Sequence, residues 1–193
     1  MSKSNKKSFS ALLKKYEDLP EDLAIHIESL LETVELPRKT ILLKAGKVCD
    51  YLYFMERGMA RNYFTDEGKE LTNDIVIEGE LLVSFSSFIS REPSNESIEL
   101  IEDSILHAIH YNDLQELYRT YPIMERIGRK MAEYHYNSLA SRTYRLKFSS
   151  SAERYDYLFK NKIEIIRRAP IGIIASYLGM TFETLSRIRS NYD

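Results

Sequence analysis

The spacing of the apolar residues predicts helices at the N-terminus. A first group of residues lies on one helical face, and a second group resumes the same spacing after Pro20. The first group is Phe9, Leu12, Leu13 and Tyr16, and the second is Leu23, Ile25, Ile27, Leu30 and Leu31. Because proline cannot continue a helix, we expect the second helix to end at Pro37.

Between residues 40 and 109 the pattern changes to short β-type segments separated by turns. The predicted strands are 40–43, 51–55, 59–64, 71–76, 81–85, 98–101 and 105–109. Gly46, Gly58 and Gly68 lie in the intervening turns, where a positive φ favours glycine. Several short strands at this spacing predict a small β-barrel or β-roll.

A long helix follows the predicted strands. Asn112 is the expected cap of a short helix over 113–118, and Pro122 suits the first turn of a helix that runs to about Arg145. At 1.5 Å per residue the second helix is on the order of 35 Å long, more than a small roll covers. We therefore expect its apolar stripe to pair with a second copy of the chain, although such stripes also occur in monomer cores. The stripe is Ile123, Ile127, Met131, Tyr134 and Leu139, and its first four residues are the predicted dimer interface.

A hinge is predicted at residues 149–151, where a run of serines interrupts the apolar pattern. Ser151 is the expected cap of the helix that follows. Ile163, Ile165 and Ile166 then predict a short β-like stretch that packs against the C-terminal segment.

The segment 169–190 has the pattern of a helix-turn-helix. Gly179 permits a tight turn after the first helix, and Thr181 is a suitable N-cap for the second. The buried positions are Ile173, Ile174, Tyr177 and Leu178 in the first helix, and Leu185 and Ile188 in the second. The opposite side of the second helix is polar, as in a recognition helix that enters a major groove.

Residues 174–188 read Ile-Ala-Ser-Tyr-Leu-Gly-Met-Thr-Phe-Glu-Thr-Leu-Ser-Arg-Ile. This segment resembles the helix-turn-helix of the Crp/Fnr family of bacterial transcription regulators. The expected DNA-binding residues are Thr181, Phe182, Glu183, Thr184, Ser186, Arg187 and Arg189. By the chemistry of base edges, Glu183 accepts from a cytosine amino group and Arg187 donates to guanine. Phe182 stands where some relatives have an arginine, and it offers a thymine methyl an apolar contact instead.

The strand region carries a second resemblance to the same family. Gly46, the run Leu52-Tyr53-Phe54 and Gly58 look like the opening strands of its cyclic-nucleotide-binding β-roll. Residues 79–80, Gly-Glu, match the start of that family's phosphate-binding cassette. In the family the cassette glutamate holds a ribose hydroxyl, and a following arginine holds the cyclic phosphate.

That arginine is missing here. With Pro93 aligned to the cassette proline, Ser94 and Asn95 stand where an Arg-Ala pair belongs. A buried phosphodiester without the guanidinium loses roughly 1.5–3 kcal/mol or more, which argues against cyclic AMP, and no cofactor is expected. Arg91 would reach the pocket only from a shifted loop, and Glu80 is equally well explained as a solvated carboxylate. The candidate pocket is Gly79, Glu80, Ser94 and Asn95, for an unknown small-molecule effector or for none.

Charge is distributed unevenly along the 193 residues, whose net charge is −2. Residues 142–193 carry ten Lys and Arg against five Asp and Glu, and residues 1–141 carry seventeen against twenty-four. A basic C-terminal part on an acidic body is typical of a DNA-binding segment attached to a non-binding one.

Composition excludes several other classes. One cysteine, Cys49, excludes an internal disulfide framework and a four-thiolate iron-sulfur site. The N-terminus lacks the apolar core of a signal peptide and no run of eighteen apolar residues occurs, so a cytoplasmic location without membrane partners is expected. The four histidines are scattered and no catalytic motif is present, so neither a metal site nor an enzyme is predicted.

Together these patterns predict an α+β fold with three parts: residues 1–121, a double-stranded β-roll; 122–148, a dimerisation helix; and 149–193, a helix-turn-helix. The chain stops at Asp193, so the second β-hairpin, or wing, of many relatives is not expected. The predicted function is transcription regulation as a homodimer on duplex DNA, with RNA polymerase as a further partner that the resemblance allows. The alternative is a ligand-binding or protein-interaction module whose helix-turn-helix does not bind DNA.

Overall fold

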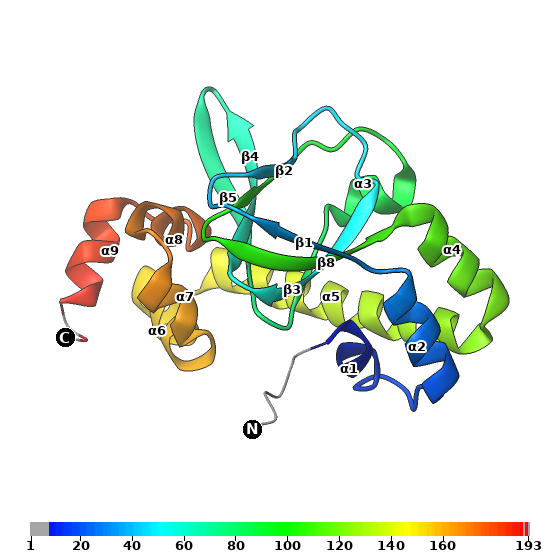
Figure 1. Cartoon of the computed structure of the whole chain (residues 1–193). Coiled ribbons are helices and arrows are strands. Elements are labelled where there is room, and N and C mark those ends of the chain that lie inside the picture. The colour runs from blue at the N-terminus through cyan, green and yellow to red at the C-terminus, as the bar shows by residue number, and fades with distance from the viewer. Residues whose placement is uncertain (1–7, 191, 193) are drawn as a thin grey trace, which may run out of the picture.

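The computed structural model describes residues 8–190 and 192. A β-roll lies in the middle of the molecule, with one group of helices at each end and a long helix that runs beneath the roll and connects them (Figure 1). The C-terminal helices form the end opposite to that of the N-terminal helices.

Two antiparallel four-stranded sheets form the roll. The first has the order β1-β8-β3-β6 and the second the order β2-β7-β4-β5. The strands are β1 (Glu32–Leu36), β2 (Ile41–Leu43), β3 (Tyr51–Arg57), β4 (Met59–Asp66), β5 (Lys69–Ile77), β6 (Leu81–Leu82), β7 (Ser97–Leu100) and β8 (Ser104–His110). Strands β1 and β8 pair across about seventy residues of sequence, so the sheet depends on long-range contacts.

Glycines shape the turns of the roll as the sequence predicted. Gly46, Gly58 and Gly68 all have positive φ, at 85°, 108° and 79°. Strands β4 and β5 are joined by Glu67 and Gly68 alone, and both residues have positive φ, as a two-residue hairpin turn requires. At Gly58 an added Cβ would lie 2.2 Å from the Ser104 Oγ, so only glycine fits there.

The helices enclose the roll and extend from it. They are α1 (Phe9–Leu13), α2 (Glu21–Ser29), α3 (Phe85–Ser90), α4 (Tyr111–Thr120), α5 (Pro122–Phe148), α6 (Ser151–Asn161), α7 (Ile163–Arg168), α8 (Ile171–Tyr177) and α9 (Phe182–Arg189). Pro122 begins α5 as predicted, and its 27 residues make it about 40 Å long. Within the described residues, no helix has the length and apolar character needed to cross a lipid bilayer.

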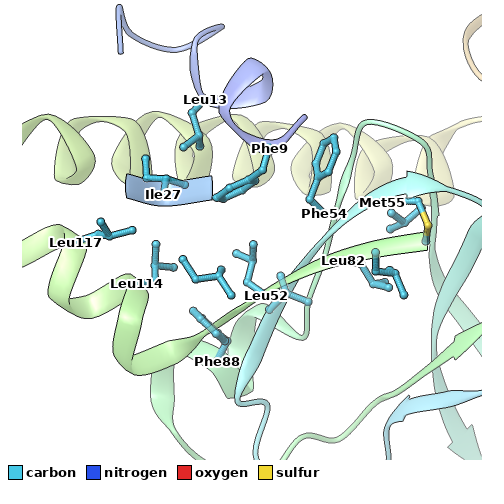
Figure 2. Close-up of a cluster of buried hydrophobic side chains, with 14 of the residues drawn as sticks. Phe9, Leu13, Ile27, Leu52, Phe54, Met55, Leu82, Phe88, Leu114 and Leu117 are labelled. Atoms are coloured by element: carbon cyan, nitrogen blue, oxygen red, sulfur yellow. The ribbon is translucent and has the colours of Figure 1, made fainter. Parts of the chain in front are cut away.

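One hydrophobic core joins the N-terminal helices to the roll. Phe9 and Leu13 of α1 and Ile27 of α2 point toward strand β3, and residues of α4 close the cluster from the other side (Figure 2). Phe9, Leu13 and Ile27 are at most 2% exposed, and Leu114 and Leu117 of α4 are at most 4% exposed. Met124 and Ile127 anchor the first turns of α5 in the same core.

A second core joins the roll to the C-terminal helices. Met59 of β4 and Ile75 of β5, both 0% exposed, belong to the same cluster as Ile165, Ile174 and Leu185. Because apolar burial is the main stabilising term in folding, this cluster holds the C-terminal helices against the roll.

Several segments form a different type of secondary structure from the one that the sequence predicted. Residues 32–36 form strand β1 because they pair with β8, so the second helix ends at Ser29 and not at Pro37. The predicted strand 81–85 ends at Leu82, and α3 begins at Phe85. The predicted β-like stretch around Ile165 is helix α7, which buries Ile165 and Ile166 together.

Two predicted caps are also displaced. His110, not Asn112, caps α4, because its Nδ1 accepts a hydrogen bond from the Asn112 backbone N–H at 3.1 Å. Ser150, not Ser151, caps α6, and it forms a reciprocal capping box with Glu153. In each case the helix begins one or two residues earlier than predicted.

Candidate DNA-binding helix and effector cavity

Helix α9 is fixed by an N-cap and by two buried side chains. Thr181 caps it as predicted, and its Oγ1 accepts a hydrogen bond from the Thr184 N–H at 3.2 Å. Leu185 and Ile188 are buried in the second core. These contacts orient one side of α9 inward and leave the other side exposed.

The outward side of α9 carries the residue types predicted for base and phosphate contacts. Thr181, Phe182, Glu183, Ser186 and Arg187 are exposed, and Thr184 and Arg189 are half-buried. The apolar ring of Phe182 is 51% exposed. No hydrogen bond or ion pair links the Arg187 guanidinium to another described residue. The pKa of Glu183 lies below its usual value because its own backbone N–H and Thr181 stabilise the carboxylate, so Glu183 is an acceptor at neutral pH.

The turn between α8 and α9 is fixed by Gly179 and by an arginine from α6. Gly179 has φ 63°, the left-handed conformation that ends a helix most easily at glycine. The Arg154 guanidinium donates to the carbonyl oxygens of Leu178 and Gly179 at 2.7 and 3.3 Å. These bonds satisfy carbonyls at the end of α8 and set the direction in which α9 leaves it.

Charged contacts fasten the same helices to the roll. Arg168, at the end of α7, forms ion pairs with Glu78 and Glu102, including Nη2 to Glu78 Oε1 at 2.7 Å. Burial by itself would raise the pKa of Glu78, but Arg168 and the N–H groups of Glu78 and Gly58 outweigh it and hold this pKa at about 2. In addition, the Ser176 Oγ accepts from the Thr72 N–H of β5 at 2.8 Å.

A cavity of about 1230 Å³ lies between the roll and helix α5. Of the predicted pocket residues, Gly79, Glu80 and Asn95 line it. Ser94 does not. It is 3% exposed, and its hydroxyl bonds to Ser84 Oγ and donates to the Glu96 carbonyl.

Glu80 is held by a residue of the C-terminal helices. Its Oε1 lies 2.8 Å from the Lys162 Nζ, at the junction of α6 and α7, and its Oε2 accepts from the Ile77 N–H at 3.2 Å. Burial lowers the pKa of Lys162, but the charges of Glu80 and Asp74 outweigh it and raise this pKa overall. For Asp74, burial raises the pKa although Lys162 opposes it. Glu80 therefore has a partner already, which neither sequence interpretation of this residue foresaw.

Arg91 does not supply the missing cassette arginine. Its guanidinium donates to the Cys49 carbonyl at 2.7 Å, pairs with Asp50 and lies 4.0 Å from the centre of the Tyr111 ring. It is not among the residues that line the cavity.

The residues predicted for the dimer interface mostly face the chain's own core. Ile127 is 1% exposed, and Ile123 and Met131 pack half-buried against the same cluster. Ile127 is therefore covered within its own chain and has no surface left for a partner, whereas for the half-buried Ile123 and Met131 the interface assignment stays a prediction. Tyr134 is 68% exposed, although its ring meets Tyr16 edge-on.

Three residues near these sites were missed by the sequence interpretation. Lys162 and Arg168 lie far in sequence from the acidic residues that they contact, so only the fold reveals them. Glu96 lies two residues before Ile98 on the way into β7, and both side chains are buried. The signal for Glu96 was available, because alternation along a strand places a carboxylate on the face that also buries Ile98 and Leu100.

The histidines lie in separate places. His107 bonds to Glu56 at 2.6 Å and to Thr33 at 2.9 Å, His110 caps α4, and His135 lies against Phe85. Among the residues that the structure describes, no group of three or more His, Cys, Asp and Glu could hold a metal ion.

Comparisons with known proteins show what the chain is similar to. The family model of the cyclic nucleotide-binding domain matches residues 33–121. No curated protein sequence matches the chain. Residues 33–121, which comprise the β-roll with α4, are therefore similar to a cyclic nucleotide-binding domain.

Solved structures extend the likeness to the whole chain. The catabolite activator protein of Thermus thermophilus shares 20% identity at a TM-score of 0.59, over 93% of this chain and 85% of that one. FixK2 of Bradyrhizobium japonicum shares 17% identity at a TM-score of 0.71, over 83% of both chains. A Crp/Fnr-family regulator of Eubacterium rectale shares 18% identity at a TM-score of 0.70, over 91% of this chain and 84% of that one. The chain has the fold of the Crp/Fnr regulators, which confirms the resemblance that its sequence indicated.

Proposed function

We propose that the chain is a transcription regulator of the Crp/Fnr type that binds duplex DNA as a homodimer and is not an enzyme. Its working parts are the roll (1–121), the connecting helix (122–148) and the DNA-binding helices (149–193). The roll is the sensory part, and its effector is not cyclic AMP bound in the usual way. RNA polymerase is a further partner in this proposal, and the cytoplasm is its place of action.

The observation that carries the proposal is the surface of α9. Arg187 is exposed and uncommitted within the described chain, and Glu183 is exposed and ionised. An arginine reads guanine through two hydrogen bonds, and a carboxylate accepts from cytosine, so this pair suits the edge of a G·C-containing site. Thr181 and Arg189 flank the pair at the two ends of the helix, where phosphate contacts fix the register.

The dimer is assigned to the second half of α5. In this half of the helix one side lines the cavity beneath the roll, whereas Tyr136, Ala140 and Tyr144 recur every four residues with exposed side chains. Tyr136 is 71% exposed and Tyr144 is 63% exposed. An exposed apolar row on a long helix favours helix-to-helix pairing, and a two-fold dimer presents two recognition helices to two half-sites.

The first test is selection of bound sequences from a random duplex pool, followed by titration of the winner with wild type and Arg187→Ala. We expect an enriched palindrome, and a loss of about 5- to 150-fold in affinity for Arg187→Ala, which corresponds to roughly 1–3 kcal/mol, with relaxed preference at one position. Affinity should fall steeply as salt rises, because phosphate contacts release counterions.

Arg119→Ala is the matched control for this titration. Arg119 lies on α4, at the end of the molecule away from α9, and its one ion pair among the described residues is with Glu116 on its own helix (Figure 1). Arg119→Ala removes the same charge without changing α9, so the affinity of this variant for the selected DNA should match that of wild type. If no sequence is enriched at low salt, or if Arg187→Ala behaves like Arg119→Ala, the helix-turn-helix has a structural role and the chain is an interaction module.

The dimer has a separate test. We expect Tyr136→Glu to shift the protein from dimer toward monomer in sedimentation equilibrium, because it places like charges on both sides of the paired helices. Ile25→Glu is the control, since Ile25 is 66% exposed on α2 and outside the proposed interface. Equal association of the two variants would remove α5 from the interface.

A further inference from the structure

A buried carboxylate lies in the wall of the cavity where the family's cassette would hold a phosphate. Glu96 lines the cavity and is only 7% exposed. Its Oε2 accepts a hydrogen bond from the Asn73 Nδ2 at 3.1 Å, and no ion pair links it to a Lys, Arg or His of the described chain. An ionised carboxylate removed from water is destabilising unless a cation compensates it.

The nearby cations are committed to other acceptors. The Arg142 Nη1 donates to the Asn73 Oδ1 at 3.1 Å, so the Asn73 amide separates this guanidinium from Glu96. Lys162 pairs with Glu80. Burial lowers the pKa of His135, and the charge of Glu96 opposes this only in part, so His135 is mainly neutral at pH 7.

A second buried polar group in the cavity wall has an acceptor atom without a hydrogen-bond donor. Asn62 is 5% exposed, and its Nδ2 donates to the Val83 carbonyl at 3.0 Å. That bond fixes the orientation of the amide and leaves Oδ1 as a buried acceptor without a partner in the described residues. Asn62 therefore contributes an acceptor and no positive charge to this part of the wall, and Glu96 is the acceptor that a donor bound in the cavity would meet.

An aromatic surface completes this part of the cavity. Phe85 lines it, and the Phe85 ring lies 4.0 Å from that of His135, centre to centre. The face of a phenylalanine ring attracts a cation that is shielded from water. A phosphate, by contrast, would meet the Glu96 carboxylate and the negative face of the ring.

We propose that this cavity binds an organic cation, a protonated amine or a guanidinium, which donates hydrogen bonds to Glu96. The inference deepens the proposed function, because it rests on the roll being the sensory part and names the chemical class of the effector. It also accounts for the missing cassette arginine, since a second cation in this place would compete with the ligand for Glu96.

The test is calorimetric titration of the full chain with agmatine and with putrescine, in the absence of DNA. Agmatine carries both a guanidinium and an ammonium group. We expect binding to wild type and a loss of about tenfold or more for Glu96→Gln, because a buried charge pair loses one partner. Glu92→Gln is the matched control, since it removes the same charge from an exposed position on the same loop. It should bind like wild type.

A second measurement does not depend on which cation is used. Glu96→Gln keeps an acceptor for Asn73 but removes the uncompensated charge, so the ligand-free variant should melt about 2–4 °C above wild type. Glu92→Gln should melt within about 1 °C of wild type.

Several results would overturn the inference. They are no binding of either cation at millimolar concentration, equal binding to Glu96→Gln, cyclic AMP binding in place of the cations, or a lower melting temperature for ligand-free Glu96→Gln. The last result would mean that Arg142 compensates Glu96 through Asn73. Because no DNA is present, each of these outcomes leaves the test of the DNA-binding function intact.

Discussion

Replacing Arg168 by alanine should loosen the C-terminal helices from the roll. The Arg168 side chain is 26% exposed and forms ion pairs with Glu78 and Glu102, whose side chains are 21% and 28% exposed. Arg168→Ala leaves both carboxylates partly buried and without their shared cation. The expected effect is therefore larger than for an exposed ion pair and smaller than for a fully buried one.

The pKa of Glu78 sets the magnitude. Its value of about 2 lies well below the ordinary 4.5, a difference that corresponds to roughly 3 kcal/mol of stability at neutral pH. The N–H groups of Glu78 and Gly58 share this effect with Arg168. We assign somewhat more than half of this stabilisation to Arg168. Arg168→Ala should therefore lower the free energy of unfolding by about 2 kcal/mol at pH 7.

The same linkage fixes the sign of the pH dependence. Because the pKa of Glu78 is lower in the folded state, its contribution is complete well above 4.5 and is lost as the pH falls toward about 2. Without Arg168 the pKa of Glu78 in the folded state lies closer to its value in the unfolded state. The variant therefore loses less stability than wild type as the pH falls. The difference between wild type and Arg168→Ala should therefore shrink by about a third at pH 3.

Urea denaturation at the two pH values measures both quantities. Arg167→Ala is the matched control, because Arg167 is the neighbouring residue, is 67% exposed and, within the part of the chain that the structure describes, pairs only with Glu164 on its own helix. We expect it to lie within about 0.5 kcal/mol of wild type at either pH. An Arg168→Ala variant as stable as Arg167→Ala at pH 7 would refute the reasoning, and so would an effect that grows as the pH falls.

Two further predictions concern the backbone and a helix cap. Gly58→Ala should lower the free energy of unfolding by more than about 2 kcal/mol, because the new Cβ would overlap the Ser104 Oγ and the residue has a positive φ. Gly68 also has a positive φ but has open space around it, so Gly68→Ala should lower the free energy of unfolding by about 1 kcal/mol. Ser150→Ala should cost about 1 kcal/mol through loss of the capping box, and Ser151→Ala clearly less. Thermal and urea denaturation of each pair checks the order, and a reversed order in either pair would contradict the structure.

Features with a local cause were predicted well from the sequence. Pro122 begins α5, Thr181 caps α9, and Gly58 and Gly179 adopt positive φ, because the residue type and its near neighbours decide each of these. The segment with the most complete local signal, the helix-turn-helix, was also placed correctly.

Features that depend on contacts with residues distant in sequence were not predicted from the sequence. Residues 32–36 continue a helical spacing, yet they form β1 because β8 supplies the hydrogen bonds. Isoleucines favour strands, but in α7 the adjacent Ile165 and Ile166 are both buried by the second core, and packing overrides propensity. The stripe on α5 predicted a dimer interface, and the N-terminal helices instead cover Ile127.

The same non-local contacts link the cavity to the DNA-binding helices. Lys162, at the start of α7, forms an ion pair with Glu80 in the cavity wall. Arg142 of α5 donates hydrogen bonds to Asn73 in the cavity and to the Tyr177 carbonyl at the end of α8. A ligand that uses Glu80 must therefore displace Lys162, and one that uses Asn73 alters a group bonded to Arg142. Since coupling between two sites is reciprocal, any change in α7 or α8 that a ligand causes must appear equally as a change in ligand affinity when DNA holds α9. Affinity for a cation measured with and without bound DNA would give this coupling directly, and equal affinities would mean that these contacts transmit nothing.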